Sequence, residues 1–156
     1  MIRHFIFNHN KMNKTVTEQI NQYIESQPES KALELQTLHE LILGIDPSNT
    51  LWFDNGLNSE GKVVSNPSIG YGKYTIHYAN GSTKDFFRLG LSGNKSGISI
   101  YIMGLADKNY LAQTFGERIG KATVTGYCIK FKGLKDISLG VLEEAVRYGL
   151  TYGTTQ

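Results

Sequence analysis

Cysteine is nearly absent from this chain, because Cys128 is the single thiol in 156 residues. One cysteine cannot form an internal disulfide, so folding places no demand on an oxidising compartment. Long apolar runs are missing too, since none approaches the ~20 residues that a membrane-spanning helix needs. Residues 1–16 carry charged and polar side chains where a signal peptide has a sustained apolar stretch. These absences predict a cytoplasmic protein with no membrane partner.

An excess of charge of one sign is also missing. Sixteen basic and fourteen acidic residues leave a net charge of +2. Binding to a nucleic-acid backbone uses a concentrated basic surface instead. The charge balance therefore predicts no nucleic-acid partner.

Motifs for metal binding and covalent catalysis are missing as well. The four histidines are dispersed at positions 4, 9, 39 and 77, and neither His-Glu-x-x-His nor Cys-x-x-Cys occurs. The segment 90–94 lacks the last glycine of a nucleophile elbow. We predict no metal ligand, no catalytic residue and no evident cofactor, which favours a protein that is not an enzyme. An enzyme site assembled from distant residues, with Asp85, Arg88 and His77 as candidates, is left open.

Length and composition are those of one globular domain. The chain is 40% apolar and 11% aromatic, which supplies a core without disulfides or metals, and ~100–200 residues is the usual size of one domain. We place this domain at residues 15–150, between a poorly ordered N-terminal extension at 1–14 and a tail at 151–156. Residues 1–11 could be an upstream extension, a cloning remnant or a genuine arm.

Capping residues and apolar spacing predict helices at both ends of the domain. Four N-cap candidates precede apolar stripes with helical spacing: Thr15, Ser30, Asp107 and Ser138. Glu18 completes a capping box with the first of them. Pro28 should end the first helix and Gly44 the second, so the two form a helical hairpin. A short helix and a C-terminal helix follow later in the chain.

The middle of the chain changes to the period of two that is typical of strands. Residues 73–78, 87–91 and 98–102 alternate and are separated by tight turns such as 80–81. We predict that these three segments form an antiparallel meander, and that 51–53 and 128–132 add further strands. The predicted fold class is α+β, with an antiparallel sheet of about four to six strands covered by helices mostly on one face.

A resemblance to a known family runs through the same region. The segment 66–74, Asn-Pro-Ser-Ile-Gly-Tyr-Gly-Lys-Tyr, resembles the Pro-Ser-Ile, Gly-aromatic-Gly and Tyr pattern of the YdhG-like family, a bacterial domain of unknown function. Segments 78–81, 85–95, 119–121 and 128–137 are similar to further blocks of that family, in the same order. The family's Trp-Pro is replaced by Phe86-Phe87, its Pro-Arg by Gly93-Asn94, and a His after Lys121 by Ala122. The resemblance covers roughly residues 17–148 and implies a YdhG-like fold.

The resemblance also bears on cofactors. YdhG-like proteins have been linked to a frataxin-like iron-chaperone role, which would need clustered carboxylates as hard oxygen ligands. Several acidic residues lie along the two N-terminal helices: Glu18, Glu25, Glu29, Glu34 and Glu40. Iron is therefore a cofactor that the resemblance alone suggests.

Six residues are candidates for ligand binding: Gly70, Tyr71, Gly72, Ser92, Lys95 and Lys121. The first three could bring the backbone close to a ligand, or they could form a bulge or the tight start of a strand. The last three could hold an anion if loops bring them together, or the lysines could be ordinary solvated side chains. An aromatic-rich set either lines a pocket or fills the core: Tyr71, Tyr74, Tyr78, Phe86, Phe87 and Tyr101.

The leading hypothesis is a noncatalytic small-ligand or accessory binding module. Its partner would be an unknown small molecule or anion, because the matched glycines and lysines come without a reactive constellation. Self-association as a homodimer through an exposed strand or aromatic patch is left open.

Overall fold

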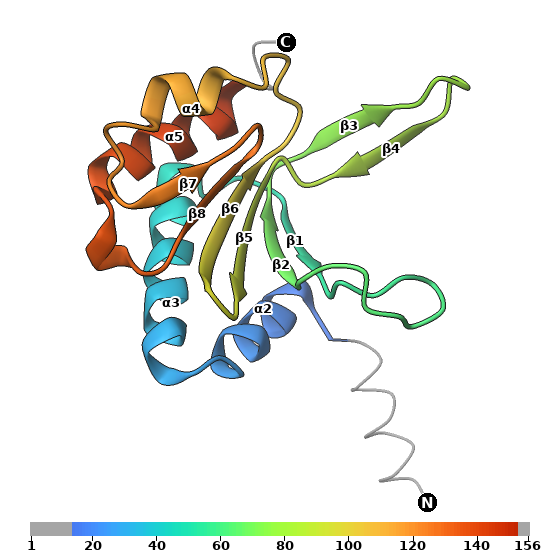
Figure 1. The fold of residues 1–156 in the computed structure, drawn as a ribbon. Coiled ribbons are helices and arrows are strands. Elements are labelled where there is room, and N and C mark those ends of the chain that lie inside the picture. The colour runs from blue at the N-terminus through green and yellow to red at the C-terminus, as the bar shows by residue number, and fades with distance from the viewer. Residues whose placement is uncertain (1–13, 153–156) are drawn as a thin grey trace, which may run out of the picture.

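The structure, a computed structural model, describes residues 14–152 and arranges them as helices against a central sheet (Figure 1). The N-terminal half contains α2 (Val16–Glu25), α3 (Glu29–Ile45), β1 (Leu51–Asp54), β2 (Ser68–Tyr71), β3 (Tyr74–His77) and β4 (Thr83–Phe86). The C-terminal half contains β5 (Leu89–Asn94), β6 (Gly97–Ile102), α4 (Tyr110–Phe115), β7 (Ala122–Val124), β8 (Cys128–Phe131), the 3-10 turn η1 (Leu134–Asp136) and α5 (Leu139–Tyr152).

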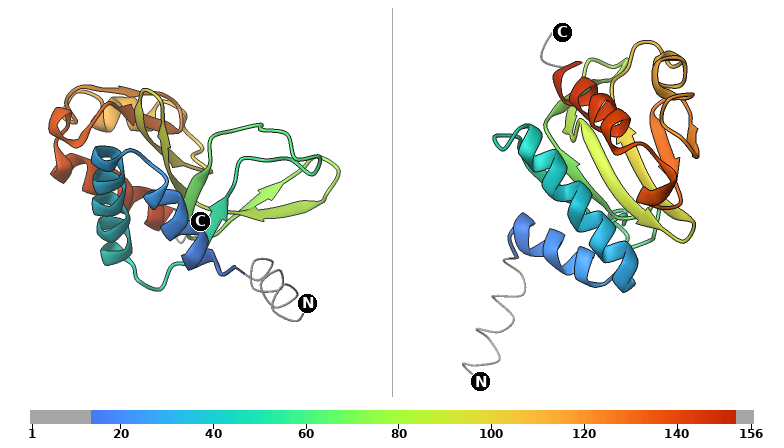
Figure 2. Two further views of the ribbon diagram at one scale, coloured as in Figure 1. Left: turned by 90° about the horizontal axis from the view of Figure 1, so that it is seen from below. Right: turned by 90° about the vertical axis from the view of Figure 1, so that its left-hand side faces the viewer.

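Six strands form one antiparallel sheet in the order β1-β2-β5-β6-β8-β7, and β3 pairs only with β4 in a separate two-stranded sheet. Figure 2 shows α2, α3 and α5 on one face of the large sheet, whereas the β3–β4 hairpin and the loop between β1 and β2 project away from the helices. The predicted α+β class, the helical hairpin, the short helix between late strands and the C-terminal helix are confirmed.

The core lies between the helices and the inner face of the sheet. Alternation puts Ile98, Ile100 and Ile102 of β6 on that face, each at most 1% exposed. They are covered by apolar stripes of the helices, which include Ile20, Leu35, Leu38, Ile42, Leu142 and Val146. Burial of these aliphatic side chains, at about 25 cal/mol per Å² of apolar area, is the main stabilising contribution.

Two of the four predicted helix caps are confirmed and two are wrong. Thr15 Oγ1 accepts a hydrogen bond from the Glu18 N–H at 3.1 Å, and Ser138 Oγ accepts one from the Val141 N–H at 3.3 Å. Ser30 does not cap the second helix, because α3 already begins at Glu29 with Pro28 as its N-cap residue. Proline's fixed φ suits a helix start, so the helix begins one residue before the serine. Asp107 does not cap the short helix, because α4 begins at Tyr110 with Asn109 as its N-cap residue.

The predicted meander is wrong in its first strand. Tyr74–His77 pairs with Thr83–Phe86, and the place beside β5 is taken by β2, whose Ile69 lies opposite Leu91. Gly72 has a φ of +75° and turns the chain out of the sheet immediately after β2. Alternation shows that a segment is a strand but carries no information about which strand it pairs with, so the hairpin could not be told from a sheet strand.

The domain bounds were predicted at residues 15–150, and the last helix continues to Tyr152. The predicted N-terminal extension and tail lie mostly outside the described residues, which begin at residue 14 and end at 152.

Candidate functional site

The face of the sheet that points away from α2, α3 and α5 carries polar side chains at its β6–β8 half. Ser99 and Tyr101 alternate with the core isoleucines of β6, and they lie opposite Lys130 and Cys128 of β8. Thr123 of β7 continues the row beyond Lys130. Lys130 and Thr123 are exposed on this polar half of the sheet, the open face, whereas Tyr101 and Cys128 are half-buried and Ser99 is buried beneath them.

The other half of the same face is covered by aromatic rings. A Cβ on Gly70 would lie 2.6 Å from Phe87 Cβ, and one on Gly90 would lie 2.7 Å from Phe87 Cε1. The Phe87 ring therefore occupies space that only glycines leave free. Its centroid lies 4.1 Å from that of the tilted Phe86 ring. The Phe86 ring in turn meets Trp52 edge-on, with their centroids 6.3 Å apart. Gly70 thus accommodates an aromatic side chain of the protein itself.

Tyr71 and Gly72 also have structural partners. The Tyr71 side chain is fully buried, and its hydroxyl lies 2.6 Å from His39 Nδ1 on α3. Burial raises the pKa of Tyr71 well above its ordinary value, and burial lowers the pKa of His39, against a smaller opposing effect of Glu40. The carbonyl of Gly72 accepts a hydrogen bond from Trp52 Nε1 at 2.7 Å. The first three candidate residues therefore contribute to packing on both sides of β2.

Ser92 is buried and links β5 to the loop between β1 and β2. Its hydroxyl donates to the carbonyl of Pro67 at 2.6 Å. The neighbouring Asn66 is held at the rim of the open face by this bond. Ser92 therefore positions a residue of the hollow described next, without lining it.

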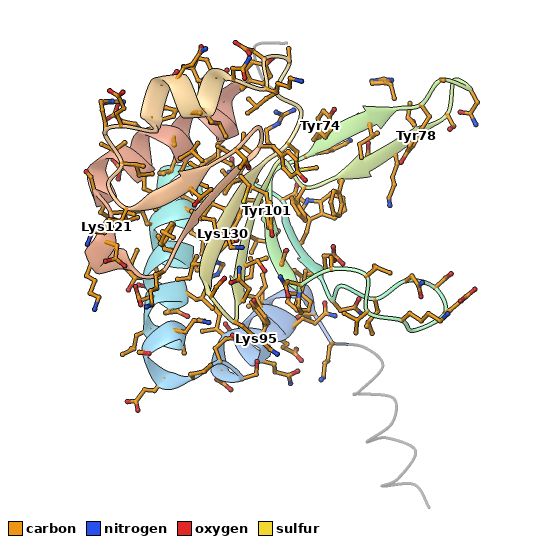
Figure 3. The ribbon with its side chains drawn as sticks, viewed as in Figure 1. Tyr74, Tyr78, Lys95, Tyr101, Lys121 and Lys130 are labelled. Atoms are coloured by element: carbon orange, nitrogen blue, oxygen red, sulfur yellow. The ribbon has the colours of Figure 1, made fainter. Side chains whose placement is uncertain are left out.

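Lys95 lies at a basic hollow of about 420 Å³ on the open face. The hollow is lined by Asn66, Asn94, Lys95, Ser96, Ser99, Tyr101, Cys128 and Lys130. Asn94 organises its floor, since its Nδ2 donates to Ser99 Oγ at 3.1 Å and its Oδ1 accepts from the Ser96 N–H at 3.0 Å. Figure 3 shows Lys95, Lys130 and Tyr101 following one another along this face.

Lys121 does not line the same hollow as Lys95. It lies at a neighbouring depression of about 320 Å³ that shares Ser96 and Lys130 with the basic hollow. It also borders a wider depression of about 690 Å³ in which Glu34 and Asp136 supply opposite charge. The structure therefore brings Lys95 together with Lys130, and places Lys121 farther along the same edge.

In the part of the chain that the structure describes, no carboxylate forms an ion pair with Lys95 or Lys130 of the open face. Within residues 14–152, ion pairs shorter than 4.0 Å join Lys62 to Glu60, Lys73 to Asp85, Arg118 to Glu144 and Arg147 to Glu143. None of them involves Lys95 or Lys130. Burial raises the pKa of the Cys128 thiol, and this outweighs its hydrogen bond with Ser99 and the positive charge of Lys130. The hollow thus offers two unpaired cations beside a thiol that stays protonated.

An apolar hollow of about 440 Å³ continues the open face beyond Tyr101. It is lined by Tyr74, Ile76, Met103, Gly104, Leu105, Lys108, Gly126 and Tyr127. The Tyr101 and Tyr127 rings, with centroids 6.4 Å apart, stand between the two hollows.

Two of the three residues considered for an assembled enzyme site, Asp85 and Arg88, have other partners. Asp85 pairs with Lys73 at 3.4 Å and accepts a hydrogen bond from Thr75 Oγ1 at 2.9 Å. Arg88 lies over the Tyr74 ring at 5.1 Å and donates to the Met103 carbonyl.

Lys130 and Ser99 were not among the predicted site residues. The signal for their orientation was present, since Ser99 stands between Ile98 and Ile100 and Lys130 between Ile129 and Phe131. Their pairing across β6 and β8, however, depends on long-range packing. In residues 14–152 no three His, Cys, Asp or Glu side chains are grouped so that they could hold a metal ion. No helix in this range is both long and apolar enough to cross a membrane.

Comparison of the chain with family models, curated proteins and solved structures gives no match. The resemblance to the YdhG-like family therefore stays a prediction from the residues quoted for it.

Proposed function

We propose that this protein is a noncatalytic binding module that takes a small anion in the basic hollow of its open sheet face. The observation that carries the proposal is the convergence of Lys95 and Lys130, neither of them ion-paired, on one hollow of about 420 Å³. Sites for small molecules usually have volumes of ~300–1,000 Å³ and a few convergent polar groups.

The chemistry of the lining favours a carboxylate or a phosphate as the bound group. Two ammonium groups supply charge-assisted hydrogen bonds, each worth about 1.5–3 kcal/mol when well formed. The Ser99 hydroxyl accepts from Asn94 Nδ2 and is itself hydrogen-bonded to the Cys128 thiol. An anion therefore finds two opposite charges in one place.

Binding without chemistry is supported by the state of the nucleophile in the hollow. Thiols react as thiolates, and a raised pKa keeps the Cys128 thiol protonated at neutral pH.

The test is a thermal-shift screen with sodium phosphate, citrate and acetate, followed by titration calorimetry of every anion that shifts the melting temperature. A ligand at ten times its Kd stabilises the folded state by about 1.4 kcal/mol, which raises Tm by about 3–5 °C in a domain of this size. The double variant Lys95→Gln/Lys130→Gln should lose the shift. The charge-matched control Lys62→Gln/Lys84→Gln, on exposed lysines of the projecting loop and hairpin, should retain it.

Absence of a shift with all three anions, or equal loss in both double variants, would reject the basic hollow as a site. Iron binding, which the family resemblance implies, is a separate prediction. The same calorimetric titration with ferrous and ferric iron tests it.

A further inference from the structure

The basic hollow and the apolar hollow are neighbours on the open face, with the Tyr101 and Tyr127 rings between them. Strand β6 carries Ser99 and Tyr101 into the basic hollow, and Met103, which follows the strand, continues the alternation into the apolar one. Tyr127 and Cys128 are consecutive in sequence, and Tyr127 lines the apolar hollow whereas Cys128 lines the basic one. In Figure 3, Lys95, Lys130, Tyr101 and Tyr74 succeed one another from the turn of the sheet to the β3–β4 hairpin.

The two neighbouring hollows have opposite chemical character. From Ser99 to Met103 the strand advances by roughly 13 Å, at about 3.3 Å per residue. Lys95 and Lys130 lie at one end of that distance. The side chains of Tyr74, Ile76 and Met103, each half-buried, lie at the other. Lys108 stands on the rim of the apolar end.

We infer that the ligand of this face is an amphipathic organic anion, whose acidic head lies between Lys95 and Lys130 and whose apolar chain passes Tyr101 into the hollow of Tyr74, Ile76 and Met103. This inference rests on the proposed anion site and adds the class of molecule that it takes. The two hollows, of about 420 and 440 Å³, together suit a ligand of ordinary metabolite size.

The apolar lining explains why a chain is preferred to a bare anion. Tyr74 and Tyr127 provide flat apolar surface with polar tips, and Met103 is flexible enough to adapt to a chain of varying length. Each methylene group that leaves water should strengthen binding by about twofold to fourfold, because burial in an open groove is incomplete. A bare phosphate or acetate uses only the basic end.

The experiment is titration calorimetry with sodium butyrate, hexanoate and octanoate below their micelle concentrations, and with 1-octanol as the uncharged analogue. Affinity should rise at least tenfold from butyrate to octanoate, and octanol should bind at least tenfold more weakly than octanoate. Lys95→Gln/Lys130→Gln should weaken all three carboxylates and leave octanol unchanged. Ile76→Thr/Met103→Gln should remove the dependence on chain length and leave butyrate unchanged.

Lys108→Gln is the control for the direction of the ligand, and circular dichroism establishes that each variant is folded. Octanoate should bind this variant at least tenfold more tightly than it binds Lys95→Gln/Lys130→Gln, because its head group lies at the other end. If Lys108→Gln weakens octanoate as much as the double lysine variant does, the proposed direction is wrong.

The outcomes separate the two proposals. Equal affinity for butyrate and octanoate would overturn the amphipathic ligand and leave the anion site standing. Octanol binding as tight as octanoate binding would overturn the role of the head group. If neither the carboxylates nor inorganic phosphate bind, the proposed function fails, and this inference fails with it.

Discussion

The packing of Phe87 on two glycines can be tested by the substitution Gly90→Ala. The added Cβ would lie 2.7 Å from Phe87 Cε1, 3.0 Å from Cζ and 3.4 Å from Tyr101 Cδ2. Carbon atoms in contact prefer about 3.5–4.0 Å, so the ring would have to retreat. It cannot do so freely, because it also lies against Gly70 and stacks on Phe86. We expect a loss of about 1–3 kcal/mol in the free energy of unfolding, as for other overpacked cores.

The reasoning makes a stronger prediction when Phe87 is absent. Gly90 does not have a positive φ, so alanine fits its backbone. In a Phe87→Ala background, Gly90→Ala should stabilise the protein by about 0.4–1 kcal/mol, through the lower entropy of the unfolded chain. Phe87→Ala by itself should cost about 3–5 kcal/mol, which a domain with about 5–15 kcal/mol of stability can survive.

Urea unfolding followed by the fluorescence of Trp52, the single tryptophan, measures all four proteins of this cycle. Far-UV circular dichroism checks that the transition is two-state. Gly44→Ala in α3 is a matched control, because a Cβ there meets nothing within 4 Å, and it should stabilise by up to about 1 kcal/mol. The same cost of Gly90→Ala with and without Phe87 would refute the proposed steric conflict.

Two further predictions concern groups that support the site. Ser92→Ala removes the donor to the Pro67 carbonyl, so it should lower the free energy of unfolding in urea by about 1–2 kcal/mol. It should also weaken anion binding, because Asn66 is no longer held in place. Unchanged binding would mean that the loop does not support the hollow. His39 is buried against Tyr71 and has a lowered pKa, so between pH 7.5 and 5.5 the unfolded chain takes up the proton more readily than the folded one. The contribution of His39 to the free energy of unfolding should therefore be complete above about pH 6.5. It should fall as the pH drops toward the folded-state pKa, by at most ~1.4 kcal/mol per pH unit. His39→Gln should flatten this dependence, and an unaltered slope would mean that other groups cause it.

Much of the architecture could be predicted because it depends on local patterns. The cap at Thr15, the helical hairpin and the alternation of Ile98 to Ile102 each follow from residues within a few positions of one another. The prediction was wrong where the answer depended on partners far away in sequence. Segment 74–77 alternates like a sheet strand, yet it pairs only with 83–86.

The candidate site divides in the same way. Lys95 was predicted as a binding residue, and it lines the basic hollow. The glycines and Tyr71 were predicted either to approach a ligand or to form a bulge or a tight strand start, and in the fold their neighbours are Phe87, Trp52 and His39. A close approach to glycine can be made by a ligand or by the protein's own side chain, and local sequence does not distinguish the two.

The sequence by itself determined which face of each strand is apolar, because burial of one face is a local property with a period of two. This placed Ser99 and Lys130 away from the core before any partner was known. Only the tertiary structure decided that β6 lies beside β8, that Ser92 holds the loop carrying Asn66, and that Lys95 and Lys130 line one hollow. The reason is that strand order follows from how whole apolar surfaces pack together. The strand order in turn decides which charged side chains share a face. A nearly neutral chain can therefore gather unpaired positive charge on one face, although no local sequence pattern indicates it.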